Sequence, residues 1–148
     1  MPPAEARFPA ADTSGADRAT RLTVKTAAEA RDVLAGLMSG VPHHSPAVLM
    51  DAQLAVTELV SNASRHAGGM TGFEACLDLD GDRLVVEVED ADPRHPAGEP
   101  LALRDPTAPG GRGWAMILVL ADTSAIDPLP GGGKRIRITF ALRAAPGA

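Results

Sequence analysis

The chain has 148 residues, of which 45% are hydrophobic and 22% charged, and its formal net charge is −5. This length and composition are typical of one globular domain with its own core, while the acidic balance argues against a basic nucleic-acid-binding face. The single cysteine excludes an internal disulfide, and the lack of a long apolar run or a secretory leader predicts a cytoplasmic protein with no membrane contact.

The two ends of the chain show no hydrophobic periodicity. Residues 1–18 are rich in Pro, Ala and small polar residues, and residues 144–148 have the same character. Such segments cannot bury enough apolar surface to fold, so both are expected to be disordered tails. One ordered domain is therefore predicted over residues 19–143.

The domain is expected to begin with a short strand and two helices. Arg21 to Lys25 is the candidate strand. Thr26 followed by Glu29 has the spacing of a capping box and predicts a helix that runs to about Met38.

The second helix has the strongest periodic pattern in the chain. Ser45-Pro46 provides a capping residue and a proline at the first helical position. An apolar stripe at helical spacing continues to about His66, and Gly68-Gly69 should end the helix.

The remaining elements are mostly strands. Asp80-Gly81-Asp82 is a hairpin turn signal, and a long proline-rich stretch from Ala91 to Pro109 resembles a lid or binding loop. The predicted elements are strands at 71–80 and 83–90, a helix at 114–122, a short strand at 123–127 and a strand at 135–142. The total of three helices and about five strands predicts an α+β fold, a two-layer sandwich with a mostly antiparallel sheet and three helices on one face.

A polar edge accompanies the apolar stripe of the second helix. Glu58, Asn62 and His66 are four residues apart and share one side of the helix. An amide oxygen there could ligate Mg²⁺, and a carboxylate could accept a proton from a hydroxyl. From spacing alone, a solvated helix edge is the simpler interpretation, and His66 alone is best explained as a last-turn residue near exposed carbonyls.

Asp90 ends an apolar strand and is followed at once by irregular chain. A buried carboxylate at this point could accept a hydrogen bond from an amino group, such as that of adenine. A simple strand-end cap is the alternative that this segment leaves open.

A glycine-rich segment precedes the third predicted helix. Gly110, Gly111 and Gly113 would let backbone N–H groups approach an anion at the helix start, and Arg112 adds donors suited to phosphate. A flexible turn is the alternative. The spacing is not that of a P-loop, and Gly131 to Lys134 is better explained as a hairpin turn.

The order of these segments suggests a family. Two segments resemble motifs of the GHKL ATPases, which have the Bergerat fold. They are ELVSNASRH from Glu58 to His66 and GGRGWAM from Gly110 to Met116. The closest resemblance is to the anti-sigma-factor serine/threonine kinases. It covers roughly Leu22 to Leu142, including LVLAD from Leu118 to Asp122.

The resemblance implies ATP and Mg²⁺ as ligands and a role for each segment. Glu58 would be the general base toward the accepting serine hydroxyl, and Asn62 would hold Mg²⁺ against the phosphates. Asp90 would accept a hydrogen bond from the adenine amino group, and the glycines would let the lid and helix start wrap the phosphates. The candidate nucleotide-binding residues are Asn62, His66, Asp90, Asp92, Gly111, Arg112 and Gly113.

The resemblance also implies a protein partner. In such kinases the acceptor is a serine of a small anti-sigma-factor antagonist, which frees the sigma factor only when unphosphorylated. The sigma factor is a second candidate partner. Kinases of this type are often dimers, which leaves a homodimer open.

The adenine box departs from the family pattern. The family usually has Asp-x-Gly-x-Gly, whereas this chain has Asp90-Ala91-Asp92-Pro93-Arg94, so Asp92 and Arg94 replace both glycines. Backbone approach to a nucleotide is expected to be restricted. The alternative to a kinase is thus a non-catalytic regulator, either nucleotide-sensing or nucleotide-free, and a third hypothesis is a domain whose matches are coincidental.

Overall fold

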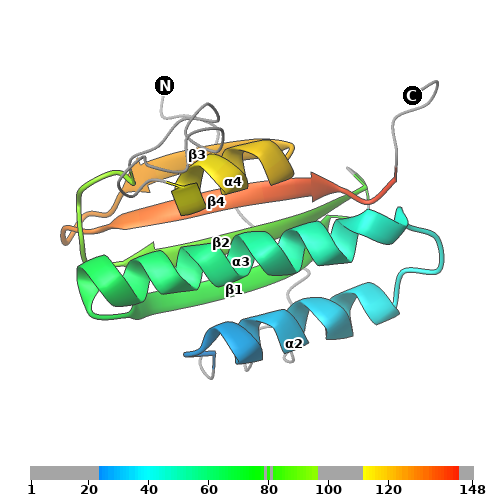
Figure 1. Cartoon of the computed structure of the whole chain (residues 1–148), viewed down its shortest axis with the longest axis horizontal. Coiled ribbons are helices and arrows are strands. Elements are labelled where there is room, and N and C mark those ends of the chain that lie inside the picture. The colour runs from blue at the N-terminus through cyan, green and yellow to red at the C-terminus, as the bar shows by residue number, and fades with distance from the viewer. Residues whose placement is uncertain (1–23, 79, 81, 97–111, 144–148) are drawn as a thin grey trace.

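The computed structural model of the chain describes residues 24–78, 80, 82–96 and 112–143. The elements within them are α2 (Ala27–Ser39), α3 (Pro46–Ala67), β1 (Met70–Asp78), β2 (Arg83–Asp90), α4 (Arg112–Leu120), β3 (Thr123–Pro128) and β4 (Lys134–Ala141). The helices cover one face of the sheet (Figure 1), which confirms the predicted α+β fold. Both expected tails and residues 97–111 lie outside the described residues.

Helix α2 begins where its local sequence predicts. The Thr26 side chain accepts a hydrogen bond from the Glu29 backbone, and the Glu29 carboxylate accepts one from the Thr26 backbone. This reciprocal capping satisfies backbone donors that have no partner within the helix. The face that carries Ala30, Leu34 and Met38 is buried.

Helix α3 has Pro46 in its first turn and ends at Gly68, whose φ of 75° is left-handed. Both features match the prediction, because proline fits the first helical turn and glycine adopts this φ without a steric penalty. Ser45 is the N-cap residue, as predicted, but its side chain makes no capping hydrogen bond. Its backbone N–H instead donates to the Leu142 carbonyl oxygen at 2.7 Å and joins the helix start to the chain after β4.

The described strands form one antiparallel sheet in the order β1-β2-β4-β3. The sheet has four strands in the described part of the chain, against about five expected. The missing candidate, Arg21 to Lys25, lies mostly outside the described residues, and its last two residues, Val24 and Lys25, are not in a strand.

The helix-facing side of the sheet is built from cross-strand rows. Three buried pairs join β2 to β4 on this side: Leu84 with Phe140, Val86 with Ile138, and Val88 with Ile136. Since side chains of one face recur every second residue, the next pair of the same rows is Asp90 with Lys134. The apolar rows therefore end in a carboxylate and an ammonium.

Helix α4 runs from Arg112 to Leu120, so it begins and ends two residues before the predicted Trp114 and Asp122. Its end is decided by the sheet. The Asp122 backbone N–H donates to the Thr139 carbonyl oxygen at 2.8 Å, and the Asp122 carboxylate accepts from the Ala141 N–H at 2.5 Å. These bonds to β4 turn the chain out of the helix and into β3.

Candidate functional site

The polar edge of α3 lies beside the start of α4. Glu58 and Asn62 are half-buried, and His66, in the last turn, is exposed. The Asn62 Oδ1 atom accepts a hydrogen bond of 2.6 Å from the Arg65 guanidinium, one turn further along the helix. The predicted magnesium ligand thus already has a cationic neighbour within its own helix.

Helix α3 lies between α2 and α4 (Figure 1). On one side Arg31 of α2 donates to the Thr57 hydroxyl at 3.0 Å. On the other side Gly113 of α4 lies so close to Glu58 that a Cβ added at Gly113 would overlap the Glu58 Oε2 atom. The structure therefore brings the Glu58 carboxylate directly against the start of α4.

The predicted phosphate-binding residues lie at or just before the start of α4. Gly111 lies outside the described residues, and Arg112 is the first residue of α4. Gly113 is the member of the glycine-rich segment whose surroundings are known. Behind it, Ala115 and Ile117 are fully buried and anchor α4 in the core.

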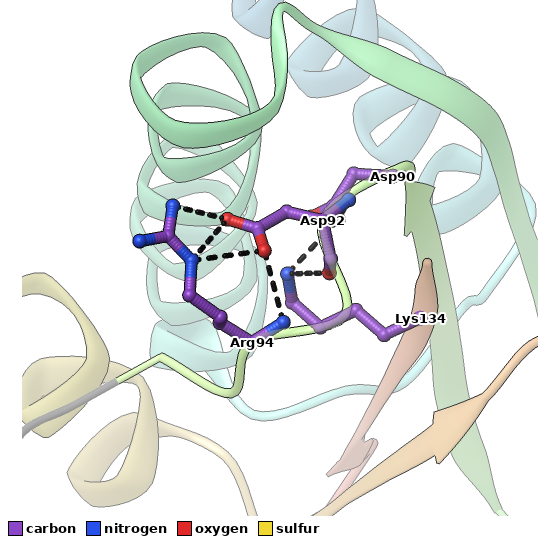
Figure 2. A network of polar contacts seen from close by, with 4 residues as sticks. All are labelled: Asp90, Asp92, Arg94 and Lys134. Carbon is purple, nitrogen blue, oxygen red and sulfur yellow. Dashed lines mark hydrogen bonds and ion pairs between the residues drawn. The ribbon is translucent and has the colours of Figure 1, made fainter. Parts of the chain in front are cut away.

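Asp90 and Lys134 form a buried ion pair at the end of the sheet. Each residue is 5% exposed. The Lys134 Nζ atom donates to Asp90 Oδ1 at 2.9 Å and to the Asp92 carbonyl oxygen at 2.8 Å. The carboxylate assigned to the adenine amino group therefore holds an internal cation, as Figure 2 shows.

This ion pair and the polar edge of α3 lie at the same end of the molecule. Helix α3 ends at Ala67 and β1 begins at Met70, whose partner on β2 is Asp90. The short connection between α3 and β1 thus places Asp90 close to the last turn of α3.

Asp92 and Arg94 pair with each other in the loop after β2 (Figure 2). The Arg94 Nε and NH2 groups donate to the Asp92 carboxylate at 2.9 to 3.1 Å, and the Arg94 backbone N–H donates to it at 2.9 Å. These hydrogen bonds lower the pKa of Asp92 to about 2, so its carboxylate is ionised at neutral pH. Asp92 and Arg94, which stand at the positions of the family's two glycines, therefore fix the loop after β2 through their mutual hydrogen bonds.

The turn between β3 and β4 approaches the end of β2 very closely. Gly133 has a φ of +81°, and a Cβ added there would overlap the Asp90 carbonyl oxygen. Only glycine combines this φ with such a close approach. The contact positions the Lys134 backbone against Asp90.

Lys134 is the residue that the sequence analysis missed, since it was assigned only to the end of a hairpin turn. A signal was present in the pattern of β4. Lys134 is two residues before Ile136 and therefore takes an inward position in the alternation of that strand. A charge at an inward position indicates a buried partner, and Asp90 is the charge at the equivalent position of β2.

A family model described as the histidine kinase-like ATPase domain matches residues 20–140 of the chain. The chain belongs to this family. A comparison with curated proteins found none that matches the chain. Membership in the histidine kinase-like ATPase family supports the GHKL resemblance and an ATP-binding regulatory role. No helix in the described part of the chain is long and apolar enough to cross a membrane.

Proposed function

We propose that this histidine kinase-like ATPase domain is a serine/threonine kinase that transfers the γ-phosphoryl group of ATP to a partner protein. The observation that carries the proposal is the contact between Glu58 and Gly113. A helix N-terminus offers backbone N–H groups and a partial positive charge to phosphate. A carboxylate held beside it lies where a hydroxyl approaching the terminal phosphate needs a base.

Glu58 is the proposed general base. Its carboxylate accepts the proton of the serine hydroxyl while the hydroxyl oxygen bonds to the γ-phosphorus, and the bond to the bridging oxygen of ADP breaks. A positioned base of this kind contributes about 10²- to 10⁴-fold to a rate. Because Gly113 has no side chain, the base and the phosphate-binding helix start can be neighbours.

Asn62 is the proposed ligand of Mg²⁺. Its amide oxygen has two lone pairs, so the bond from Arg65 leaves one for a cation. Oxygen ligands together with several retained waters suit Mg²⁺, which when bound neutralises charge on the β- and γ-phosphates. Asn62 lies one helical turn from Glu58, so a metal held by Asn62 would be on the same side of α3 as the proposed base.

The proposed protein partner is a small anti-sigma-factor antagonist, with a sigma factor as a second partner. The support is the likeness of the segment from Glu58 to His66 to the anti-sigma-factor kinases. The membership in the ATPase family is consistent with this assignment at a coarser level.

A non-catalytic regulator is the second candidate function. It is favoured by the adenine box, where Lys134 already pairs with Asp90 and where Asp92 and Arg94 stand in the positions of the family's glycines. A domain of this kind would bind its partner without phosphoryl transfer.

The test combines ATP titration with two substitutions on α3. Calorimetry with and without Mg²⁺ should show ATP binding by the wild type. Glu58→Gln should keep ATP affinity within about 3-fold and lower phosphate transfer at least about 100-fold, since only the base is lost. Asn62→Ala should weaken binding in Mg²⁺ about 10-fold, because a ligand of the metal is removed.

Transfer is measured as label from γ-³²P-ATP on serine of a protein retained from extract of the source cells. Ser64→Ala, an exposed change on the same helix, is the control and should behave as wild type. Normal transfer by Glu58→Gln would disprove the assigned base. No binding at millimolar ATP would reject the kinase and leave the non-catalytic regulator.

A further inference from the structure

The two oxygens of the Asp90 carboxylate have different surroundings. Lys134 Nζ donates to Oδ1 at 2.9 Å, and the Asp92 backbone N–H donates to the same Oδ1 at 2.9 Å. Among the described residues, the hydrogen bonds of the Asp90 carboxylate both fall on this one oxygen. Oδ1 is thus held by protein donors, and Oδ2 is left as the acceptor for a ligand.

Burial makes this arrangement rigid. Asp90 and Lys134 are each 5% exposed, and a buried charge is tolerated only when it is paired and hydrogen-bonded. Lys134 has a second anchor in the Asp92 carbonyl oxygen at 2.8 Å. Since the ammonium is fixed from two sides, the carboxylate cannot rotate without breaking a buried ion pair.

We propose that Lys134 is a positioning residue that sets the base specificity of the nucleotide site. This inference rests on the proposed binding of ATP by the same site. Lys134 holds the Asp90 carboxylate through Oδ1, so that Oδ2 is the oxygen left to accept a hydrogen bond from the base. The site then selects purines with a 6-amino group and rejects purines with a 6-oxo group, whose oxygen would face Oδ2.

Substitution by an amide turns this geometry into a sharp test. In Asp90→Asn both donors, Lys134 Nζ and the Asp92 N–H, require the amide oxygen at the position of Oδ1. The amide NH₂ group must then occupy the position of Oδ2 and present donors to the ligand. The preference should change from the 6-amino to the 6-oxo purine.

The probes are ATP and inosine triphosphate, which differ at the 6-position of the base, each in the presence of Mg²⁺. The readout is the ratio of their two dissociation constants, measured by calorimetry. The wild type should prefer ATP by at least about 100-fold, because a buried acceptor is left unpaired by the oxo group. Asp90→Asn should invert the ratio to favour inosine triphosphate by about 10-fold. In the Asp90→Asn/Lys134→Met double variant the preference should shrink to within about 3-fold, since one of the two donors that orient the amide is gone.

The control is Arg135→Met. Arg135 pairs with Glu89 across the same two strands at 2.8 Å, but one residue further along and therefore on the opposite face of the sheet. Arg135→Met removes a cross-strand ion pair that is more exposed than the pair of Asp90 and Lys134, and it should leave the ratio unchanged. If Lys134 had only a structural role, Lys134→Met would weaken the binding of ATP and of inosine triphosphate equally. The ratio of their dissociation constants would then stay at the wild-type value.

Besides an unchanged ratio in Lys134→Met, three outcomes would overturn the inference. Asp90→Asn could retain the wild-type preference, or the single and double Asp90→Asn variants could share one ratio, or Lys134→Met could bind ATP more tightly than wild type. The last result would mean that Lys134 competes with the nucleotide for Asp90. Wild-type protein that binds neither nucleotide would reject the proposed function itself, a result seen before any variant is made. If Lys134→Met does not fold, the double variant, which removes both buried charges, carries the test.

Discussion

Gly113 and Glu58 are the residues whose contact joins two distant segments of the chain into one candidate site. The contact exists only because position 113 has no side chain, since a Cβ would overlap Glu58 Oε2. The overlapped atom is the far end of a flexible side chain, so a larger residue would displace the Glu58 carboxylate and leave the backbone in place. Function and stability should therefore respond differently to a change at this position.

Gly113→Ala should lower phosphate transfer about 10- to 100-fold, because a displacement of about 1 Å from the reacting position has an effect of this size. Folding stability should stay the same or rise by up to about 1 kcal/mol, since alanine is the better helix former. The measurements are the transfer assay and urea unfolding of the same preparation.

Gly36→Ala is the matched control for this change. Gly36 also lies within a helix, and a Cβ there would meet nothing within 4 Å. The same gain in stability is expected with full transfer activity. Equal activity of Gly113→Ala and wild type would show that the position of Glu58 does not matter.

At the scale of the elements, the turn between β3 and β4 decides how the end of β2 is held. Gly132 and Gly133 both have positive φ, +94° and +81°, which disfavours residues with a side chain. They differ in surroundings, because a Cβ at Gly132 would meet nothing within 4 Å, whereas one at Gly133 would overlap the Asp90 backbone. The pair separates the conformational effect of a glycine from its packing effect.

Gly132→Ala should lower the free energy of unfolding by about 1–2 kcal/mol through strained φ alone. Gly133→Ala should lower it by at least about 1 kcal/mol more, because the turn must also move away from Asp90. Urea unfolding at neutral pH measures both. Equal losses would mean that the turn moves freely and does not position Lys134.

At the scale of the whole molecule, the sheet has two faces with different chemistry. On β2 and β4 the face toward the helices is apolar except for the ion pair at its end, whereas the other face of these two strands carries Glu87, Glu89, Arg135 and Arg137. Glu87 is buried, with 8% exposure. Burial raises the pKa of Glu87 from 4.5 to about 7, against the lowering effect of Arg135 and Arg137.

This raised pKa predicts a pH dependence of folding. The folded pKa lies above the unfolded value, so the contribution of Glu87 is complete below pH 4.5 and is lost as the pH rises through about 7. The difference between 4.5 and about 7 corresponds to at most about 3 kcal/mol. Glu87→Gln should therefore gain stability relative to wild type between pH 5 and pH 8.

Urea unfolding of both proteins at these two pH values tests the prediction. The quantity to compare is the difference in free energy of unfolding between the two proteins, at pH 5 and at pH 8. Other groups that titrate in this range are common to both proteins and cancel in this difference. A difference that is the same at pH 5 and pH 8 would contradict a raised pKa of Glu87.

Features that depend on residues close together in the sequence were predicted correctly, whereas features that depend on distant residues were not. The capping box at Thr26, the left-handed Gly68 and the alternation of β4 were predicted because each depends on residues within one turn or one strand. The structure departs from the local prediction at Ser45, whose side chain makes no capping bond, and at the end of α4. In both places a backbone N–H donates to a residue that is distant in the sequence, Leu142 just after β4 or Thr139 within it.

The candidate site was predicted as a set of residue types and not as an arrangement. The spacing of Glu58 and Asn62 on one helix followed from helical geometry, whereas the contact of Glu58 with Gly113 required α4 to pack against α3. The roles of these residues stay predictions.

The sequence by itself determined the helices, the strand alternation, the fold class and the identity of the polar residues, because local propensity and hydrophobic period depend on neighbours along the chain. Only the tertiary structure decided that Lys134 pairs with Asp90, 44 residues apart. The register of β2 against β4 sets which charges meet, and a one-residue shift of that register would turn one of these two side chains to the opposite face of the sheet.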